Sequence, residues 1–199
     1  LDFSKASIAS FDVPPTGSTL AASWQLNRAL RCWEEDRRQP MPLLEVARCW
    51  LQRHLPELDR ASWIHGDYRS GNFLFDEDAA KITAILDWER CTIGDRHRDL
   101  AWATSEAIGH YDESGQLLVC GLLTLPEFLS EYERASGLKV DPSRLHYYTV
   151  LCRYQQAATV LGTGHRVVKL RRSHQDILLA RVEAASYVLL EELRLALAQ

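Results

Sequence analysis

The sequence predicts an α+β protein that is mainly helical, with one small β-hairpin at its centre. Most of the 199 residues fall in long segments with apolar side chains at helical spacing, bounded by Pro, Gly and capping residues. Two short apolar runs, 72–75 and 82–86, flank the turn sequence Asp-Glu-Asp-Ala-Ala and are typical of two paired strands. The chain shows no internal repeat, so these segments indicate one helical domain organised around the hairpin.

Composition and charge narrow the function classes. Hydrophobic residues make up 46% and charged residues 25% of the chain, which is ordinary for a globular protein with a sizeable core. The formal net charge of −4 argues against a nucleic-acid partner, and no apolar run is long enough to span a membrane. Five scattered cysteines without a C-x-x-C pair favour reduced thiols, so we expect a cytoplasmic protein.

Two helices are expected ahead of the hairpin. The first runs from Ser18, as its cap, to about residue 38, and the second runs from Pro42 to about residue 54. The expected buried stripe of the first consists of Leu20, Trp24, Asn27, Leu30 and Trp33. The expected apolar face of the second consists of Leu43, Val46, Ala47, Trp50 and Leu51.

Four helices are expected after the hairpin, at about 99–109, 126–136, 142–161 and from residue 173 onward. A turn at 112–115 follows the first of them, and Thr124 with Glu127 forms a capping box for the second, which stops at Gly137. The third has one apolar face and ends at 162–164, a Gly-Thr-Gly sequence; the face consists of Tyr147, Leu151, Tyr154, Ala158 and Leu161. The fourth opens with Ser173 and Asp176, and its buried stripe consists of Leu178, Val182, Ala185, Leu189 and Leu193.

Three polar residues around the hairpin predict phosphoryl-transfer chemistry. Asp67 and Asn72 precede the first strand, and Asp87 follows the second. Transfer from ATP needs a carboxylate near the acceptor hydroxyl and oxygen ligands for Mg²⁺, which these three side chains provide. Each residue alone is more typical of a turn or a cap. Their joint order, with strands in the correct places, favours a kinase-type site.

The motif HGDYRSGNFLFD, followed by ITAILDWERCTIGDRHRDLAW, resembles the aminoglycoside phosphotransferase and choline-kinase-like superfamily. In particular, it is similar to the branch of kinase domains fused to acyl-CoA dehydrogenases. The family pattern is matched at His65, Gly66, Asp67, Asn72, Asp87, Trp88, Glu89, Gly94, Asp95, Asp99, Leu100 and Ala101. The resemblance implies the C-terminal lobe of a protein-kinase-like fold, with ATP as phosphate donor and Mg²⁺ as cofactor.

The resemblance also assigns roles to single residues. It implies that Asp67 is the catalytic base and that Asn72 and Asp87 are the magnesium ligands. His65 is expected to orient the catalytic loop, and Asp99 is expected to brace that loop from the following helix. An ordinary N-cap role for Asp99 is physically compatible with the bracing role. Trp88 and Trp102 are expected in the core. Arg96 stands where the family usually has Pro, and we expect it to loosen that turn.

The residues before Trp63 offer no Gly-rich phosphate loop and no strand lysine, because Lys5 is the only lysine there. We therefore expect residues 1–199 to form the catalytic-loop and acceptor-binding lobe alone. The N-terminal nucleotide-binding lobe would be absent, and the isolated chain would have little activity.

The acceptor is expected to be a small-molecule hydroxyl. Arg166, Arg171 and Arg172 are candidate substrate-binding residues and would favour an anionic acceptor such as a hydroxyacyl-CoA, although such a run is more often a solvated loop. A non-catalytic binding or scaffold protein that keeps the fold is the alternative. A protein kinase is disfavoured because the span from Asp87 to Asp99 is too short for an activation loop and the A-P-E segment is missing.

Overall fold

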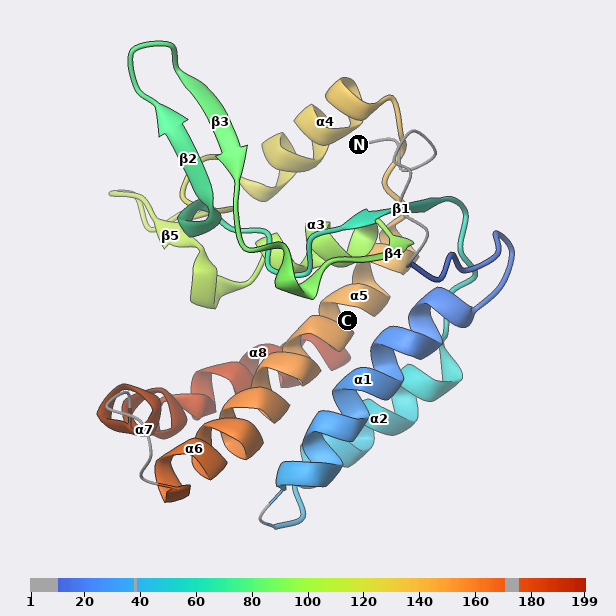
Figure 1. Cartoon of the computed structure of the whole chain (residues 1–199), viewed down its shortest axis with the longest axis vertical. Coiled ribbons are helices and arrows are strands. Elements are labelled where there is room, and N and C mark those ends of the chain that lie inside the picture. The colour runs from blue at the N-terminus through green and yellow to red at the C-terminus, as the bar shows by residue number, and fades with distance from the viewer. Residues whose placement is uncertain (1–10, 38, 171–175) are drawn as a thin grey trace.

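The structure is a computed structural model that describes residues 11–37, 39–170 and 176–199. A helical region forms one part of the molecule, and the short strands, the short helix α3 and helix α4 form the other (Figure 1). The predicted fold class, mainly helical with a small hairpin, is confirmed.

The helical region is built around α5 (Pro142–Ala158). Against it lie α1 (Leu20–Asp36), α2 (Pro42–Arg53) and α8 (Ser186–Leu197), while α6 (His165–Leu170) and, beside it, α7 (Asp176–Ala184) lie beyond its C-terminal end. The predicted apolar face of α5 is confirmed, because Tyr147, Leu151, Tyr154 and Ala158 are buried in the main core and Leu161 packs against it. Burial of this continuous face contributes hydrophobic stabilisation to the region.

The stripes predicted for α1 and α2 are partly wrong. Trp24 on α1 is 40% exposed and Val46 on α2 is 59% exposed. The buried positions are Ala21, Ala22, Leu26, Ala29 and Trp33 on α1 and Leu44, Ala47 and Leu51 on α2. Small residues allow a helix to approach its neighbours closely, so close packing selected a face that side-chain size did not indicate. The cap also differs, because α1 begins after Thr19 while the Ser18 hydroxyl donates to Pro15 O at 2.7 Å.

The predicted end of the α5 helix at 162–164 is wrong. The chain continues through a π-helical turn, Thr159–Gly164, directly into α6. A Cβ on Gly162 would lie 3.0 Å from the Cβ of Asp36, and the Thr163 hydroxyl donates to Asp36 Oδ2 at 2.7 Å. The glycine therefore permits close approach to the end of α1 and does not stop the helix.

The single last helix that the sequence predicted is divided into α7 and α8 at Ala185. On α7 the expected stripe is wrong, since Leu178 is 62% exposed and Val182 is also exposed, whereas Leu193 on α8 is fully buried. Ser173 lies outside the described residues.

The described residues form three two-stranded antiparallel sheets. The predicted hairpin is confirmed as β2 (Phe73–Asp76) and β3 (Lys81–Ile85), with a bulge between Leu74 and Phe75. A second pair, β1 (Ala61–Ile64) with β4 (Thr92–Asp95), was missed. A third pair, β5 (His110–Tyr111) with β6 (Leu117–Leu118), spans the predicted turn.

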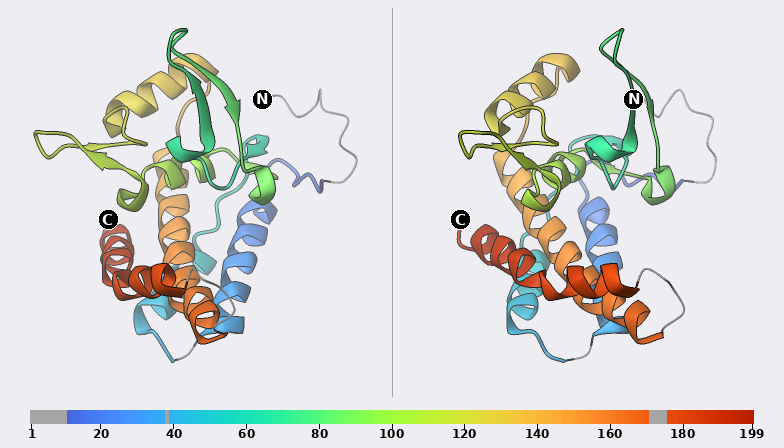
Figure 2. Two further views of the ribbon diagram at one scale, coloured as in Figure 1. Left: turned by 60° about the vertical axis from the view of Figure 1, so that its left-hand side comes forward. Right: turned by 90° about the vertical axis from the view of Figure 1, so that its left-hand side faces the viewer.

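Two further helices flank the strands. Helix α3 (His97–Ala103) begins earlier and ends earlier than expected, because the chain turns into a 3-10 segment, Glu106–Ile108. Helix α4 (Leu125–Ser136) has the predicted Thr124–Glu127 capping box and ends at Gly137, whose φ is +70°. Figures 1 and 2 show α4 and the β2–β3 hairpin on the part of the molecule away from α6 and α7.

All five cysteines are free. Within the described ranges, no helix has both the length and the apolar character to cross a bilayer.

Candidate active site

The loop that the sequence predicts to be catalytic begins where β1 ends, at Ile64. Gly66 has φ +82°, a conformation that L side chains rarely adopt. A Cβ at this position would also lie 2.8 Å from Arg90 O, so the backbone of the loop and that of Arg90 approach closely. Both observations require glycine here. The loop then closes in a short 3-10 turn, Ser70–Asn72.

Asp99, on α3, holds the start of this loop. Its Oδ2 accepts from the His65 backbone N–H at 2.6 Å, and its Oδ1 accepts from the Gly66 N–H at 2.9 Å. Burial raises the pKa of the Asp99 carboxyl, although the two N–H donors and Arg98 act in the opposite direction. The contact fixes the backbone immediately before Asp67 from a rigid helix.

His65 links this loop to the end of the hairpin. Its Nε2 lies 2.7 Å from Leu86 O, which can only accept, and its Nδ1 lies 3.2 Å from the Asp67 backbone N–H, which can only donate. This pattern assigns the neutral tautomer with the proton on Nε2. The ring is buried and packs near Trp88, with 4.7 Å between ring centroids. His65 therefore sets the position of Asp67 relative to the strand end that carries Asp87.

The Asp67 carboxylate is 18% exposed and has donors on both oxygens. Trp102 Nε1 donates to Oδ1 at 3.0 Å, Asn72 Nδ2 donates to Oδ2 at 3.2 Å, and Arg69 Nε lies 3.5 Å from Oδ2. Such contacts hold the carboxylate in one orientation, as a general base requires. Trp102 is 7% exposed, so its expected place in the core is confirmed, but its bond to Asp67 was missed. Hydrophobic spacing carries no signal for an indole N–H contact.

A backbone hydrogen bond joins the segment that carries Asn72 to the one that carries Asp87. Leu86 N–H donates to Asn72 O at 2.8 Å, which brings the residue before Asp87 against the catalytic loop. The Asn72 amide nitrogen donates to Asp67 O at 2.9 Å. The side-chain oxygen of Asn72, Oδ1, therefore remains available to a ligand. Asp87 has φ +65° and an exposed side chain. Trp88, expected in the core, is 37% exposed.

This donor set fits Mg²⁺. One carboxylate and one amide oxygen are hard ligands, and magnesium in nucleotide sites commonly takes one or two protein ligands plus phosphate oxygens and waters. Within the described residues there is no cluster of three or more His, Cys, Asp and Glu side chains that could hold a metal by themselves. Asn72 and Asp87 are residues that could hold such an ion together with a nucleotide.

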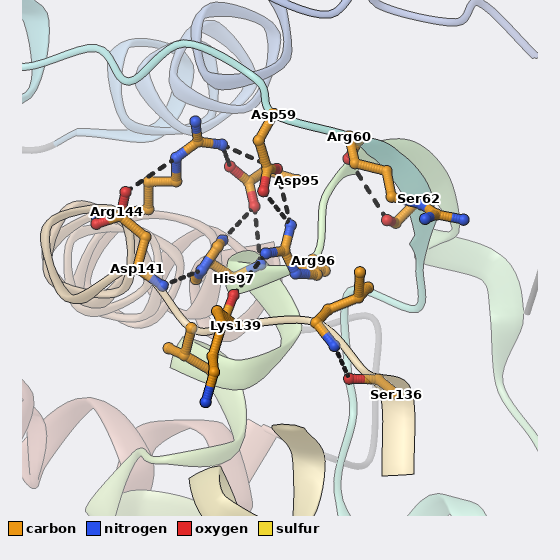
Figure 3. Close-up of polar contacts among 12 residues, drawn as sticks. Asp59, Arg60, Ser62, Asp95, Arg96, His97, Ser136, Lys139, Asp141 and Arg144 are labelled. Atoms are coloured by element: carbon orange, nitrogen blue, oxygen red, sulfur yellow. Dashed lines mark hydrogen bonds and ion pairs between the residues drawn. The ribbon is translucent and has the colours of Figure 1, made fainter. Parts of the chain in front are cut away.

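Arg96 was expected to loosen the turn before α3, but it is held there by bonds to two other segments. Figure 3 shows its guanidinium pointing at Asp59, and both carboxylate oxygens accept from Nη1 at 2.7 Å. Its Nη2 donates to Lys139 O at 2.7 Å. Arg144 joins the cluster at 2.9 Å from Asp59 Oδ1. The residue thus ties the segment before β1 to the α4–α5 connection.

His97 extends the same cluster toward α5. It is fully buried, its Nδ1 lies 2.6 Å from Asp95 Oδ1, and its Nε2 accepts from the Asp141 backbone N–H at 3.0 Å (Figure 3). If Nε2 accepts, the proton is on Nδ1, so His97 is a neutral bridge. This bridge lies two residues before Asp99.

The candidate substrate residues are not brought to this site. Arg166 lies on α6, at the other end of the molecule from the catalytic loop (Figures 1 and 2), where its Nη1 pairs with Asp36 Oδ1 at 3.2 Å. Arg171 and Arg172 lie outside the described residues. We therefore do not include Arg166 in the candidate site.

Known proteins are similar to this chain in sequence and in fold. A family model described as the phosphotransferase enzyme family matches residues 6–148, which is well over half of the chain. Acyl-CoA dehydrogenase family member 11 of Pongo abelii is 28% identical over 149 residues, covering 69% of this chain and 19% of that protein. Aminoglycoside 3'-phosphotransferase of Streptomyces fradiae is 32% identical over 101 residues, covering 51% of this chain and 35% of that protein.

The crystal structure of a candidate aminoglycoside phosphotransferase from Ralstonia eutropha is also similar. It matches with a TM-score of 0.74 at 21% identity, covering 98% of this chain and 60% of that one. This likeness confirms the predicted kinase-like fold. The chain spans about a fifth of the acyl-CoA dehydrogenase relative and three fifths of the structural neighbour.

Proposed function

The chain belongs to the phosphotransferase enzyme family, and from that premise we propose that it transfers the γ-phosphoryl group of ATP to a hydroxyl of a small molecule. The observation that carries the proposal is the arrangement of Asp67, whose two carboxylate oxygens each have a donor, beside Asn72 and the strand end bearing Asp87. This arrangement supports a base and two metal ligands within one loop-and-hairpin unit.

The proposed step is one in-line displacement. The acceptor oxygen forms a bond to the γ-phosphorus as the bond between that phosphorus and the ADP oxygen breaks. The proton of the acceptor hydroxyl goes to Asp67, and ADP leaves. Trp102 and Asn72 hold the carboxylate for this transfer, while Asp99 and His65 hold the backbone beneath it.

Magnesium would bind Asn72 Oδ1 and the Asp87 carboxylate, and when bound it offsets charge on the phosphates. The exposed, left-handed conformation of Asp87 leaves its carboxylate free to meet a ligand arriving from solvent. The backbone bond between Leu86 and Asn72 sets the spacing of the two ligands before any ion arrives.

We also propose that the 199 residues supply the acceptor and metal side of the site, and that further contacts to the nucleotide come from a segment outside them. The alcohol acceptor could be a hydroxyacyl-CoA, since several relatives are named acyl-CoA dehydrogenase family members. ATP is the proposed donor.

Assays with Mg-ATP against aminoglycosides, choline-like alcohols and hydroxyacyl-CoAs test the proposal. They should use this chain alone and the chain joined to whatever coding sequence precedes Leu1 in its gene. We expect transfer to an alcohol by the longer form and loss of transfer in Asp67→Asn, with Asp78→Asn in the hairpin turn as the matched control. Transfer that survives Asp67→Asn would refute the assigned base.

A further inference from the structure

Arg90 and Asp67 contact the same indole ring. Arg90 ends the 3-10 turn Trp88–Arg90 that follows Asp87, and its guanidinium carbon lies 5.1 Å from the centroid of the Trp102 ring. The Nε1 of that same ring donates to Asp67 Oδ1 at 3.0 Å. A cation and the proposed base are therefore separated by little more than one tryptophan side chain.

Within the part of the chain that the structure describes, no carboxylate lies within 4.0 Å of the Arg90 guanidinium, unlike that of Arg96, Arg144 or Arg153. Its backbone is fixed against Gly66, so the side chain starts from a defined place. Burial lowers the pKa of Arg90, the nearby charges of Arg98 and Arg28 lower it further, and Asp67 acts in the opposite direction. A half-buried guanidinium without an acid partner is costly unless a ligand supplies the anion.

A second guanidinium adds positive charge at the same ring. Arg98 is 2% exposed, and its guanidinium carbon lies 4.9 Å from the Trp102 centroid. Its side-chain partners are neutral, Cys152 Sγ at 3.0 Å and Gln155 Oε1 at 2.7 Å, and its buried Nε has no partner among the described residues. Two arginines therefore share one indole with no carboxylate bonded to either of them, although Arg98 is close enough to Asp99 to lower that residue's pKa.

We propose that Arg90 binds an anionic group of the acceptor, a carboxylate or a phosphate, while the acceptor's hydroxyl meets Asp67. The inference rests on the proposed function and names the class of its acceptor. Arg presents a planar fork of donors that matches both anions. Because both contacts involve one indole, the anion and the reacting hydroxyl are separated by only a few bonds, as in a small hydroxy acid or a phosphorylated polyol. This class differs from a hydroxyacyl-CoA, whose phosphates lie many bonds from its acyl hydroxyl.

Arg90 takes no part in bond making. The acceptor oxygen still attacks the γ-phosphorus of ATP, its proton still goes to Asp67, and ADP still leaves. The role of Arg90 is to position the acceptor and to select it by charge. The positive charges of Arg90 and Arg98 would repel a polycationic aminoglycoside, so it should be a poor ligand here.

Equilibrium binding measured by calorimetry tests the inference without requiring turnover. The probes are two matched pairs, 3-hydroxybutyrate with 3-hydroxybutyramide and glycerol 3-phosphate with glycerol, at one ionic strength. We expect the anionic member of at least one pair to bind about tenfold or more tightly than its neutral partner, the range of a charge-assisted hydrogen bond. The pair that shows the preference identifies a carboxylate or a phosphate as the anion.

Three variants assign the preference to Arg90. Arg90→Gln should reduce it to within about twofold, and Arg90→Lys should keep part of it because charge remains while the fork is lost. Arg31→Gln is the matched control, since Arg31 is exposed on α1 and pairs only with Glu35 among the described residues. If Arg90→Gln does not fold, as judged by its melting temperature, Arg90→Lys provides the comparison.

Equal binding of charged and neutral probes by the wild type would overturn the inference, and so would a preference that Arg90→Gln leaves intact. Tighter binding of kanamycin than of either anion would also overturn it. A clear anion preference with no transfer from Mg-ATP to any acceptor would support the inference and count against the proposed function, so the two can fail separately.

Discussion

Trp102 Nε1 donates a hydrogen bond of 3.0 Å to Asp67 Oδ1. The indole is 7% exposed and lies on α3, three residues after Asp99, which binds the backbone N–H groups of His65 and Gly66. One short helix thus fixes the catalytic loop at its backbone and at its carboxylate. We infer that α3 determines where the proposed base points.

Trp102→Phe should lower the turnover number for transfer by about tenfold or more, because it removes the donor to Oδ1 and keeps an aromatic ring in the core. KM for ATP should change little, since the indole N–H of Trp102 donates to Asp67 and not to either proposed metal ligand. Steady-state kinetics of the active form of the protein provides the measurement. Trp24→Phe on the exposed face of α1 is the control. An unchanged turnover number would mean that Asp67 is oriented by Asn72 and Arg69 alone.

Asp99→Asn should separate activity from stability. The Asn side chain has one carbonyl oxygen to accept from the backbone N–H of His65 or of Gly66, and its NH2 group faces the remaining N–H. The loop therefore loses one hydrogen bond, and the transfer rate should fall by about tenfold or more. The loss of stability should be smaller than for other buried acids, because burial raises the pKa of Asp99 and the ionised form is already disfavoured in the folded state.

The raised pKa of Asp99 determines how its contribution to the free energy of unfolding changes with pH. A carboxyl with a raised pKa in the folded state binds its proton more tightly there than in the unfolded chain. Its contribution to the free energy of unfolding therefore falls as pH rises from about 4, the pKa of an unfolded Asp, through its folded value. Asn does not titrate. The melting temperature of the wild type minus that of Asp99→Asn should accordingly be greater near pH 4 than at pH 7, and the opposite trend would contradict the raised pKa.

The sequence predicted the chemistry-bearing part of the fold better than the packing. The hairpin and the Thr124–Glu127 capping box were predicted because turn residues and caps act locally. The pairing of β1 with β4 was missed because its partners are some thirty residues apart and neither strand has strong alternation. Gly162 was read as a helix end, and only its proximity to Asp36 reveals another role. Local signals are readable, whereas contacts between distant segments are not.

The same division holds at the candidate site. The motif indicated Asp67, Asn72 and Asp87 because their order along the chain is the signal. The contacts made by Trp102 and Arg90 depend on how α3 packs beneath the catalytic loop, which no spacing in the sequence reports. Arg96 was expected to weaken a turn because only its difference from Pro was visible, and its bond to Asp59 required the fold.

Arg96→Pro should fold with α3 intact but with lower stability. The φ of Arg96 is −56°, which Pro adopts, and the preceding Asp95 is in a strand, as a residue before Pro prefers. The variant loses the hydrogen bonds to Asp59 and Lys139, whose contribution to stability is about 1–3 kcal/mol. The value should lie toward the lower end, because solvent screens the partly exposed Asp59 carboxylate. Urea unfolding measures the change, with the neighbouring Arg60→Gln as control.

The stability difference caused by Arg96→Pro should also depend on pH. Burial raises the pKa of Asp59, but the hydrogen bond and charge of Arg96, together with Arg144, outweigh it and hold the pKa below its usual value. Stability from such a carboxylate is present above about pH 4 and is lost as pH falls through the folded-state pKa. The gap between wild type and variant should therefore narrow below pH 4. A gap that stays constant would show that Asp59 contributes nothing through Arg96.

Glu192→Ala should destabilise the helical region strongly. Glu192 Oε2 on α8 pairs with Arg153 Nε on α5 at 2.6 Å, and both side chains are at least nine-tenths buried. Removing the carboxylate leaves a buried guanidinium without its ion-pair partner, which costs about 3–5 kcal/mol. Glu191→Ala is a matched control one residue away, because Glu191 is exposed and pairs with Arg194 along the same helix, so its loss should leave the unfolding midpoint nearly unchanged.

The double variant Glu192→Leu with Arg153→Met should recover much of the loss, since it removes both buried charges and keeps apolar volume between α5 and α8. Equal unfolding midpoints for Glu192→Ala and Glu191→Ala would show that the pair does not hold these helices together.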